Sequence, residues 1–142
     1  MILCDVNVLL YALRSDGDRH DEYRSWLIER LDGPENIGVS ELVLSGVVRI
    51  ATHPRVYRKP SAPSEAFAFA DAIRSRPNAV MVAPGQRHWD VFRDLCDGSG
   101  AKGNLIPDAY FAALAIEWGC EWVTTDRDYA RFPGLMWRHP LE

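Results

Sequence analysis

Short apolar runs alternate with longer segments of helical periodicity along the whole chain, and this alternation limits the fold more than any other feature. Strand-like runs lie at residues 1–4, 36–40, 79–83, 121–125 and 135–137. Apolar side chains recur at helical spacing in residues 7–14, 18–32, 41–52, 64–75, 86–96 and 106–118. Short strands that alternate with helices in this order predict an α/β sandwich with a short, mainly parallel sheet.

The chain has the length and composition of one globular domain, residues 1–142. Of its 142 residues, 47% are hydrophobic and 25% are charged, and no apolar run approaches the ~18 residues of a membrane span. The first residues carry no basic segment, so we expect no signal peptide. Three cysteines, Cys4, Cys96 and Cys120, form no CxxC pair and predict reduced thiols in a cytoplasmic protein.

The charge is distributed unevenly. A formal net charge of −4 excludes a uniformly basic nucleic-acid-binding protein. Residues 42–64 nevertheless contain no acid, whereas Arg49, Arg55, Arg58 and Lys59 all lie there. Such a basic strip can contact a phosphate backbone, or it can be an ordinary solvated loop, and charge alone does not decide between them.

Acidic residues follow the predicted strands at the points where these strands end. The acids in such positions are Asp5 after residues 1–4, Glu41 after residues 36–40, and Asp126 and Asp128 after residues 121–125. Asp108 lies in the first turn of the otherwise apolar helix predicted at 106–118. Because the carboxyl ends of parallel strands meet at one edge of a sheet, we expect these acids to converge there.

Converging carboxylates repel one another unless a cation neutralises them. Oxygen ligands without a nearby histidine suit Mg²⁺ or Mn²⁺, and such an ion can activate water for phosphodiester hydrolysis. Taken singly, Asp5 and Asp108 could be helix-capping acids and Asp126 could begin a turn. Their joint occurrence at the ends of several elements favours a metal site.

Three segments resemble one known family. DVNVLLYA at the start, SELVLSGVVRIATHPRV in the middle and GNLIPDAYFAALAIEWGCEWVTTDRDYARFPGL near the end are similar to PIN-domain toxins of the VapBC toxin–antitoxin type. The resemblance spans Ile2 to Leu141 in the same order. It implies a three-layer α/β/α sandwich and an endoribonuclease that uses Mg²⁺, for which Mn²⁺ substitutes. It also implies RNA as substrate, a small cognate antitoxin protein as partner, and a homodimer.

The same resemblance assigns roles to individual residues. It makes Asp5 and Asp108 the principal metal ligands, and Asp126 the later acid that completes the site or holds a second ion. The residues that orient or supplement these carboxylates are Asn7, Thr124 and Asp128.

In one respect the chain departs from the family pattern. Many relatives carry the remaining acid about six residues after a strand-end serine, and here that count from Ser40 leads to Gly46. Glu41 follows Ser40 directly, so either Glu41 takes the place of the missing acid or the site uses fewer acids. We predict that Glu41 is a catalytic metal ligand.

Two other functions compete with the ribonuclease hypothesis. A Mg²⁺ phosphohydrolase of the haloacid-dehalogenase type also begins with a strand-end aspartate, but it needs a second aspartate two residues later, where this chain has Asn7. A catalytically silent binding module is the other alternative, and a saturable response to Mg²⁺ or Mn²⁺ would distinguish an enzyme from it.

The early helical segments carry more large apolar and aromatic groups than one small core needs. These groups are Tyr11, Tyr23, Trp26 and Leu27. We expect them to be exposed and to form a surface that receives an antitoxin segment or a second subunit.

Overall fold

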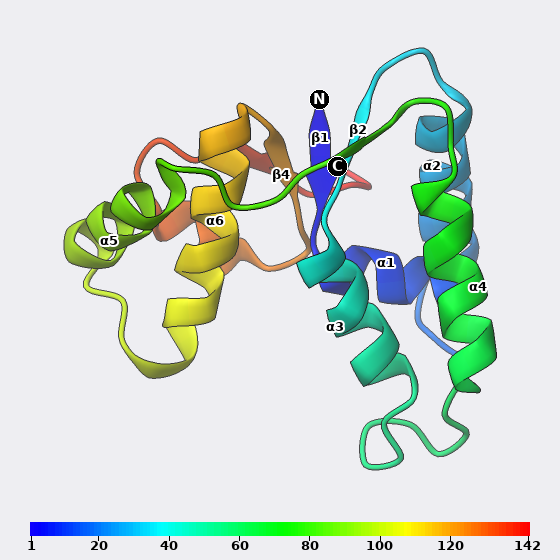
Figure 1. Ribbon diagram of the computed structural model, residues 1–142. Coiled ribbons are helices and arrows are strands. Elements are labelled where there is room, and N and C mark those ends of the chain that lie inside the picture. The colour runs from blue at the N-terminus through cyan, green and yellow to red at the C-terminus, as the bar shows by residue number, and fades with distance from the viewer.

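A five-stranded, wholly parallel sheet forms the centre of the computed structural model, which describes residues 1–142 (Figure 1). The strands are β1 (Ile2–Cys4), β2 (Ile37–Val39), β3 (Ala79–Met81), β4 (Glu121–Val123) and β5 (Trp137–Arg138). Their order in the sheet is β3-β2-β1-β4-β5. The predicted parallel α/β architecture is therefore confirmed.

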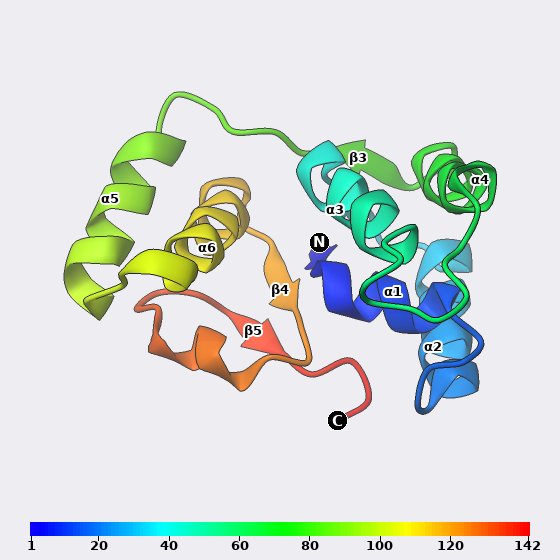
Figure 2. The same cartoon turned by 90° about the horizontal axis from the view of Figure 1, so that it is seen from below.

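Helices cover both faces of this sheet. They are α1 (Val6–Leu13), α2 (His20–Asp32), α3 (Glu41–Ala51), α4 (Pro63–Arg74), α5 (His88–Ser99) and α6 (Ile106–Trp118), with the short 3₁₀ helices η1 (Gly103–Leu105) and η2 (Arg127–Arg131). Figure 2 shows α5 and α6 on one side of the sheet and α1 to α4 on the other. These three layers confirm the predicted α/β/α sandwich. None of the helices combines the length and apolar character that a membrane span requires.

Two strand-to-helix junctions are closed by polar caps. After β1, the Asp5 carboxylate accepts a hydrogen bond from the Val6 backbone N–H at 2.7 Å. After β2, the Ser40 hydroxyl accepts one from the Val43 N–H at 3.5 Å. Such side chains satisfy backbone donors that have no partner within the helix. Each cap therefore starts a helix immediately at the carboxyl edge of the sheet.

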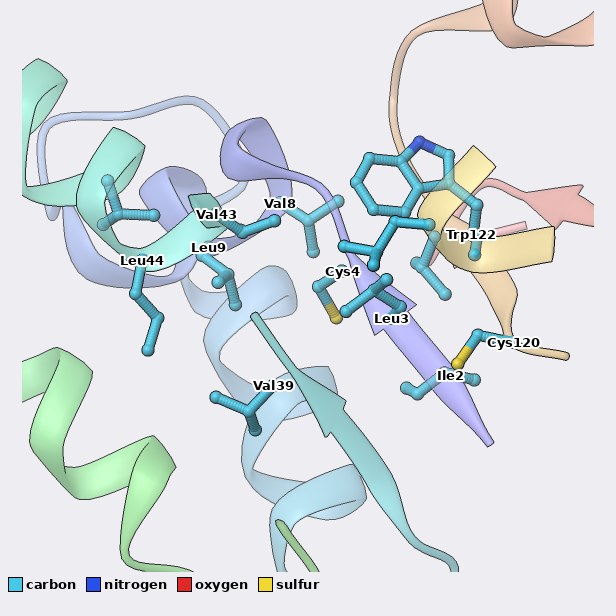
Figure 3. Packing of buried hydrophobic residues seen from close by; sticks show 14 of the residues in the cluster. Ile2, Leu3, Cys4, Val8, Leu9, Val39, Val43, Leu44, Cys120 and Trp122 are labelled. Carbon is cyan, nitrogen blue, oxygen red and sulfur yellow. The ribbon is translucent and has the colours of Figure 1, made fainter. Parts of the chain in front are cut away.

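The core surrounds β1, whose three residues are all buried (Figure 3). Leu3 packs among Val8 of α1, Val43 of α3 and Trp122 of β4, and none of these side chains is more than 2% exposed. Because β1 is covered on both faces, its sequence is continuously apolar and does not alternate.

Helix α6 is buried on several sides and is rich in alanine. Its fully buried side chains are Ala109, Ala112, Ala113, Leu114 and Ala115. Small side chains allow this helix to lie close to both β4 and α5, between which Figure 2 shows it. The helix ends at Gly119, whose φ of +66° is a left-handed conformation that suits glycine.

The expectation that the aromatic groups of the early helices are exposed was largely wrong. Tyr23, Trp26 and Leu27 are buried, with exposed fractions of 6%, 8% and 4%, and only Tyr11 reaches the surface. The reason is that α2 packs along α1, so the 23–26–27 face of α2 points into the core.

The close packing of α6 predicts that added volume there is costly. Replacing Ala113 with leucine should lower the free energy of unfolding by about 1–3 kcal/mol, because a filled core accepts extra carbons only with strain. Ala68→Leu, on an exposed position of α4, is the matched control and should change it by less than ~0.5 kcal/mol. Urea denaturation measures both values, and equal effects would contradict the tight packing.

Candidate active site

The sheet order places a topological switch point between β1 and β4. From β1 the chain proceeds outward through β2 to β3, then returns to the other side of β1 as β4. In open parallel sheets, ligands bind outside the carboxyl ends of strands at such a point. Asp5 follows β1 and Thr124 follows β4, so both lie at this edge.

Asp5 is buried and its carboxylate is held on several sides. Oδ1 accepts a hydrogen bond from the Val6 N–H at 2.7 Å. Oδ2 accepts one from the Thr124 hydroxyl at 2.6 Å and one from the Asn7 side-chain amide at 3.1 Å. These bonds fix the carboxylate between β1, α1 and the end of β4.

Thr124 and Asn7 extend this network to the loop after β4. The Thr124 hydroxyl oxygen accepts a hydrogen bond from the Asp126 N–H at 3.0 Å. The Asn7 side-chain carbonyl accepts one from the Thr125 N–H at 3.3 Å. The backbone that carries Asp126 is therefore positioned by the same two side chains that orient Asp5.

Two further acids approach Asp5 from different elements. Asp108 lies in the first turn of α6, and Asp126 precedes η2 and accepts a hydrogen bond from the Asp128 N–H at 2.9 Å. The pKa of Asp5 is raised to about 6, mainly by burial and also by the charges of Asp108 and Asp126. The hydrogen bonds from Thr124 and Val6 act in the opposite direction and lower it. Burial and the Asp126 charge likewise raise the pKa of Asp108. The three carboxylates are thus close enough to repel one another.

Tyr129 is a site residue that the sequence analysis did not identify. Its ring is buried, and its hydroxyl donates a hydrogen bond to Asp108 Oδ1 at 3.4 Å. Burial and the nearby charges of Asp5 and Asp108 raise the pKa of Tyr129, so the phenol remains a neutral donor. Nothing in its sequence position, three residues after a strand-end acid, indicated this contact.

Asp128 lies at the margin of the cluster. It is exposed, and its carboxylate is 3.7 Å from the Arg131 guanidinium. Its charge adds to those that raise the pKa of Asp108. Its backbone N–H donates to the Asp126 carboxylate, so Asp128 contacts the site through its backbone.

The structure does not bring Glu41 to these acids. Glu41 lines a groove between α3 and α4 together with Phe67 and Arg74. Gly46 lies five residues later and faces α1, since a Cβ atom there would be 3.0 Å from Val6 Cγ2. At ~100° per residue, the two positions are about 140° apart around the helix. Glu41 therefore faces the α3–α4 groove, and its role as a metal ligand stays a prediction that no contact in the structure supports.

The donor set is chemically suited to a hard divalent cation. Asp5, Asp108 and Asp126 supply only carboxylate oxygens, which Mg²⁺ and Mn²⁺ prefer. No group of three or more His, Cys, Asp or Glu side chains stands close enough together to enclose an ion. The raised pKa values of Asp5 and Asp108 nevertheless mark a local excess of negative charge that a cation would relieve.

Comparisons with known proteins agree with this fold. The model of the PIN domain family matches residues 2–135. Ribonuclease VapC43 of Mycobacterium tuberculosis is 44% identical over 143 residues, which cover 100% of this chain and 97% of that protein. Ribonuclease VapC25 of the same species is 40% identical over 140 residues, 99% of each chain. VapBC2 from Rickettsia felis, solved bound to a promoter DNA fragment, has a TM-score of 0.70 at 21% identity, with 98% of each chain covered.

The hydrogen-bond network predicts a specific cost for the loss of one hydroxyl. Thr124→Val should lower the free energy of unfolding by about 1–3 kcal/mol, because it removes one of the three hydrogen bonds to the buried Asp5 carboxylate and leaves the Asp126 N–H without its acceptor. Thr125→Val is the matched control, since the Thr125 side chain forms no hydrogen bond, and it should stay within ~0.5 kcal/mol of wild type. Chemical denaturation of the three proteins measures this, and a Thr124→Val protein as stable as the control would refute the role of the hydroxyl.

Proposed function

We propose, since the chain belongs to the PIN domain family, that it is a metal-dependent endoribonuclease and the toxin of a type II toxin–antitoxin pair. One observation carries this proposal. Asp108 and Asp126 lie near enough to the buried Asp5 carboxylate, at the β1–β4 switch point, to raise its pKa, in a chain whose full-length relatives are named VapC ribonucleases.

Asp5 and Asp108 would hold Mg²⁺ or Mn²⁺, with Asp126 as the third carboxylate. Asp5 Oδ1 accepts one hydrogen bond and Oδ2 accepts two, so Oδ1 retains an acceptor position for a cation. When bound, such an ion polarises a phosphodiester and lowers the pKa of a coordinated water. The protein itself supplies orientation: Thr124 and Asn7 hold Asp5, and Tyr129 holds Asp108.

The haloacid-dehalogenase alternative requires an acid at position 7. Asn7 instead donates to Asp5 and accepts from the Thr125 N–H, so both ends of its amide are engaged. An amide in this role cannot act as a general acid, which leaves the nuclease hypothesis and the silent binding module as the alternatives to separate by experiment.

Removing one ligand charge should abolish RNA cleavage. We expect Asp5→Asn and Asp108→Asn to reduce cleavage to the rate measured in EDTA, because each weakens the hold on the cation. Glu41→Gln, the same acid-to-amide change in the groove between α3 and α4, should cleave like wild type. RNA cleavage at saturating Mn²⁺ measures all three. Full activity in both aspartate variants would contradict the proposed metal site. Loss of activity in Glu41→Gln would support Glu41 as a metal ligand.

We also propose that an antitoxin segment occupies an apolar groove formed by α1, α2 and α4. The groove has a volume of about 250 Å³ and is lined by Ala12, Leu13, Arg24, Leu27, Ile28, Leu31, Phe69, Ala72 and Ile73. Ile28 is 45% exposed there. Support comes from the likeness of the fold to a toxin–antitoxin complex from Klebsiella pneumoniae, with a TM-score of 0.64, and from the suitability of such grooves for an amphipathic helix.

A charge in this groove should weaken antitoxin binding. Ile28→Asp should raise the dissociation constant by at least about tenfold, because it places a carboxylate in an apolar contact. Leu42→Asp, at a similarly exposed position on α3, is the matched control. The dissociation constants are measured with the small protein encoded next to this chain. Equal affinity of Ile28→Asp and wild type would place the antitoxin elsewhere.

A further inference from the structure

We propose that the loop between α3 and α4 binds the phosphate backbone of the RNA substrate, an inference that rests on the proposed function. Three cations on this loop, Arg55, Arg58 and Lys59, carry the argument. All three are exposed, and none lies within 4.0 Å of a carboxylate oxygen. Eight other arginines of the protein form ion pairs. The loop therefore presents unneutralised positive charge.

The surrounding charge strengthens this contrast. Residues 42–64 have a formal charge of +4, while the rest of the chain carries −8. A polyanion that approaches the protein is repelled by most of the surface and attracted to this strip. Phosphate contacts by lysine and arginine supply the sequence-independent part of nucleic-acid binding.

Arg14, directly after α1, holds the α3–α4 loop in place through hydrogen bonds. Its guanidinium forms a bidentate pair with Asp16 at 3.0 and 2.6 Å, so its own charge is neutralised. It also donates to the Lys59 carbonyl at 2.9 Å and to the Ser61 hydroxyl at 3.0 Å, and it lies 3.9 Å above the Tyr57 ring. Arg14 is only 9% exposed, so it has little surface with which to contact RNA. Its part is to support the loop, and the exposed cations of the loop make the contacts with RNA.

Backbone hydrogen bonds close the same loop on itself. The His53 carbonyl accepts from the Val56 and Tyr57 N–H groups at 3.1 and 3.2 Å. The Ser61 N–H donates to the Ala51 carbonyl at 2.8 Å, which joins the two ends of the loop. Arg55, Arg58 and Lys59 are thus carried on a braced segment, so less conformational entropy is lost when they bind a ligand.

The loop lies within reach of the acid cluster. Asp5 and Arg14 flank α1, which at ~1.5 Å per residue separates them by ~14 Å along the helix. At ~3.4 Å per stacked nucleotide, a strand with one phosphate at Asp5 would reach the loop within about four nucleotides. Figure 1 shows the loop beyond α1 and α3, on the side of the sheet where the strands end. One RNA strand can therefore contact the acids and the loop together.

The test is a triple variant, Arg55→Gln, Arg58→Gln and Lys59→Gln, compared with a control that changes Arg87, Arg93 and Lys102 to glutamine. Both lower the formal net charge by three, and the control cations are likewise exposed and unpaired. Binding of a labelled 12-nucleotide RNA is measured in EDTA across 50–200 mM salt. The loop variant should bind about tenfold more weakly at low salt, with a salt slope reduced by ~2, since single strands lose ~0.7 per phosphate contact. The control should match wild type.

Cleavage of the same RNA distinguishes this inference from the proposed function. In the presence of Mg²⁺ or Mn²⁺, the loop variant should show a KM raised about tenfold and an unchanged kcat. The melting temperatures of the wild type, the loop variant and the control variant should be alike. A wild-type protein that cleaves RNA, together with a loop variant of equal affinity and KM, would overturn the loop assignment alone. Binding of duplex DNA is measured in the same way. A loop variant that binds duplex DNA more weakly but binds the RNA like wild type would also overturn the loop assignment. A wild-type protein that cleaves no RNA at any Mg²⁺ or Mn²⁺ concentration would overturn the proposed function.

Discussion

The Asp5 carboxylate connects three parts of the fold through one set of hydrogen bonds. It caps α1, and it accepts from Asn7 of that helix and from Thr124 at the end of β4. Two opposing effects act on the charge of this carboxylate: the N-terminus of α1 favours the negative charge, while burial disfavours it. Burial prevails, and the pKa of Asp5 rises to about 6. The chain thus keeps a costly anion at the centre of its sheet edge, where a cation would compensate for it.

The strand order brings the other residues of the site to the Asp5 carboxylate. β1 and β4 are adjacent although 116 residues lie between Cys4, the last residue of β1, and Glu121, the first of β4, so the acids of the site approach one another only after the intervening helices have packed. Alanine-rich α6 can lie close to β4, which brings Asp108 and its partner Tyr129 to the same edge. The burial that stabilises this arrangement is also what raises the pKa values of its acids.

The acids of the site and the unpaired cations of the α3–α4 loop lie in separate regions of the molecule. The acids gather where β1 and β4 end, whereas the unpaired cations of the α3–α4 loop lie beyond the far end of α1. Arg14 joins these regions mechanically, since it follows α1 and holds the loop, but Asp16 neutralises its charge. The apolar groove of α1, α2 and α4 is lined by other residues, so a partner protein and a nucleic-acid strand can be recognised by different surfaces.

Local sequence patterns were enough to predict the helices, the strands, their parallel arrangement and the acids at strand ends, because periodicity and capping depend on neighbouring residues. They did not predict which face of a helix is buried. Tyr23 and Trp26 face the core, and Glu41 and Gly46 lie on different faces of α3. Each residue along a helix rotates the side-chain direction by ~100°, and only packing decides which direction is buried. The contact of Tyr129 with Asp108 depends in the same way on how η2 meets α6, an approach between segments distant in the chain that tertiary structure alone decides.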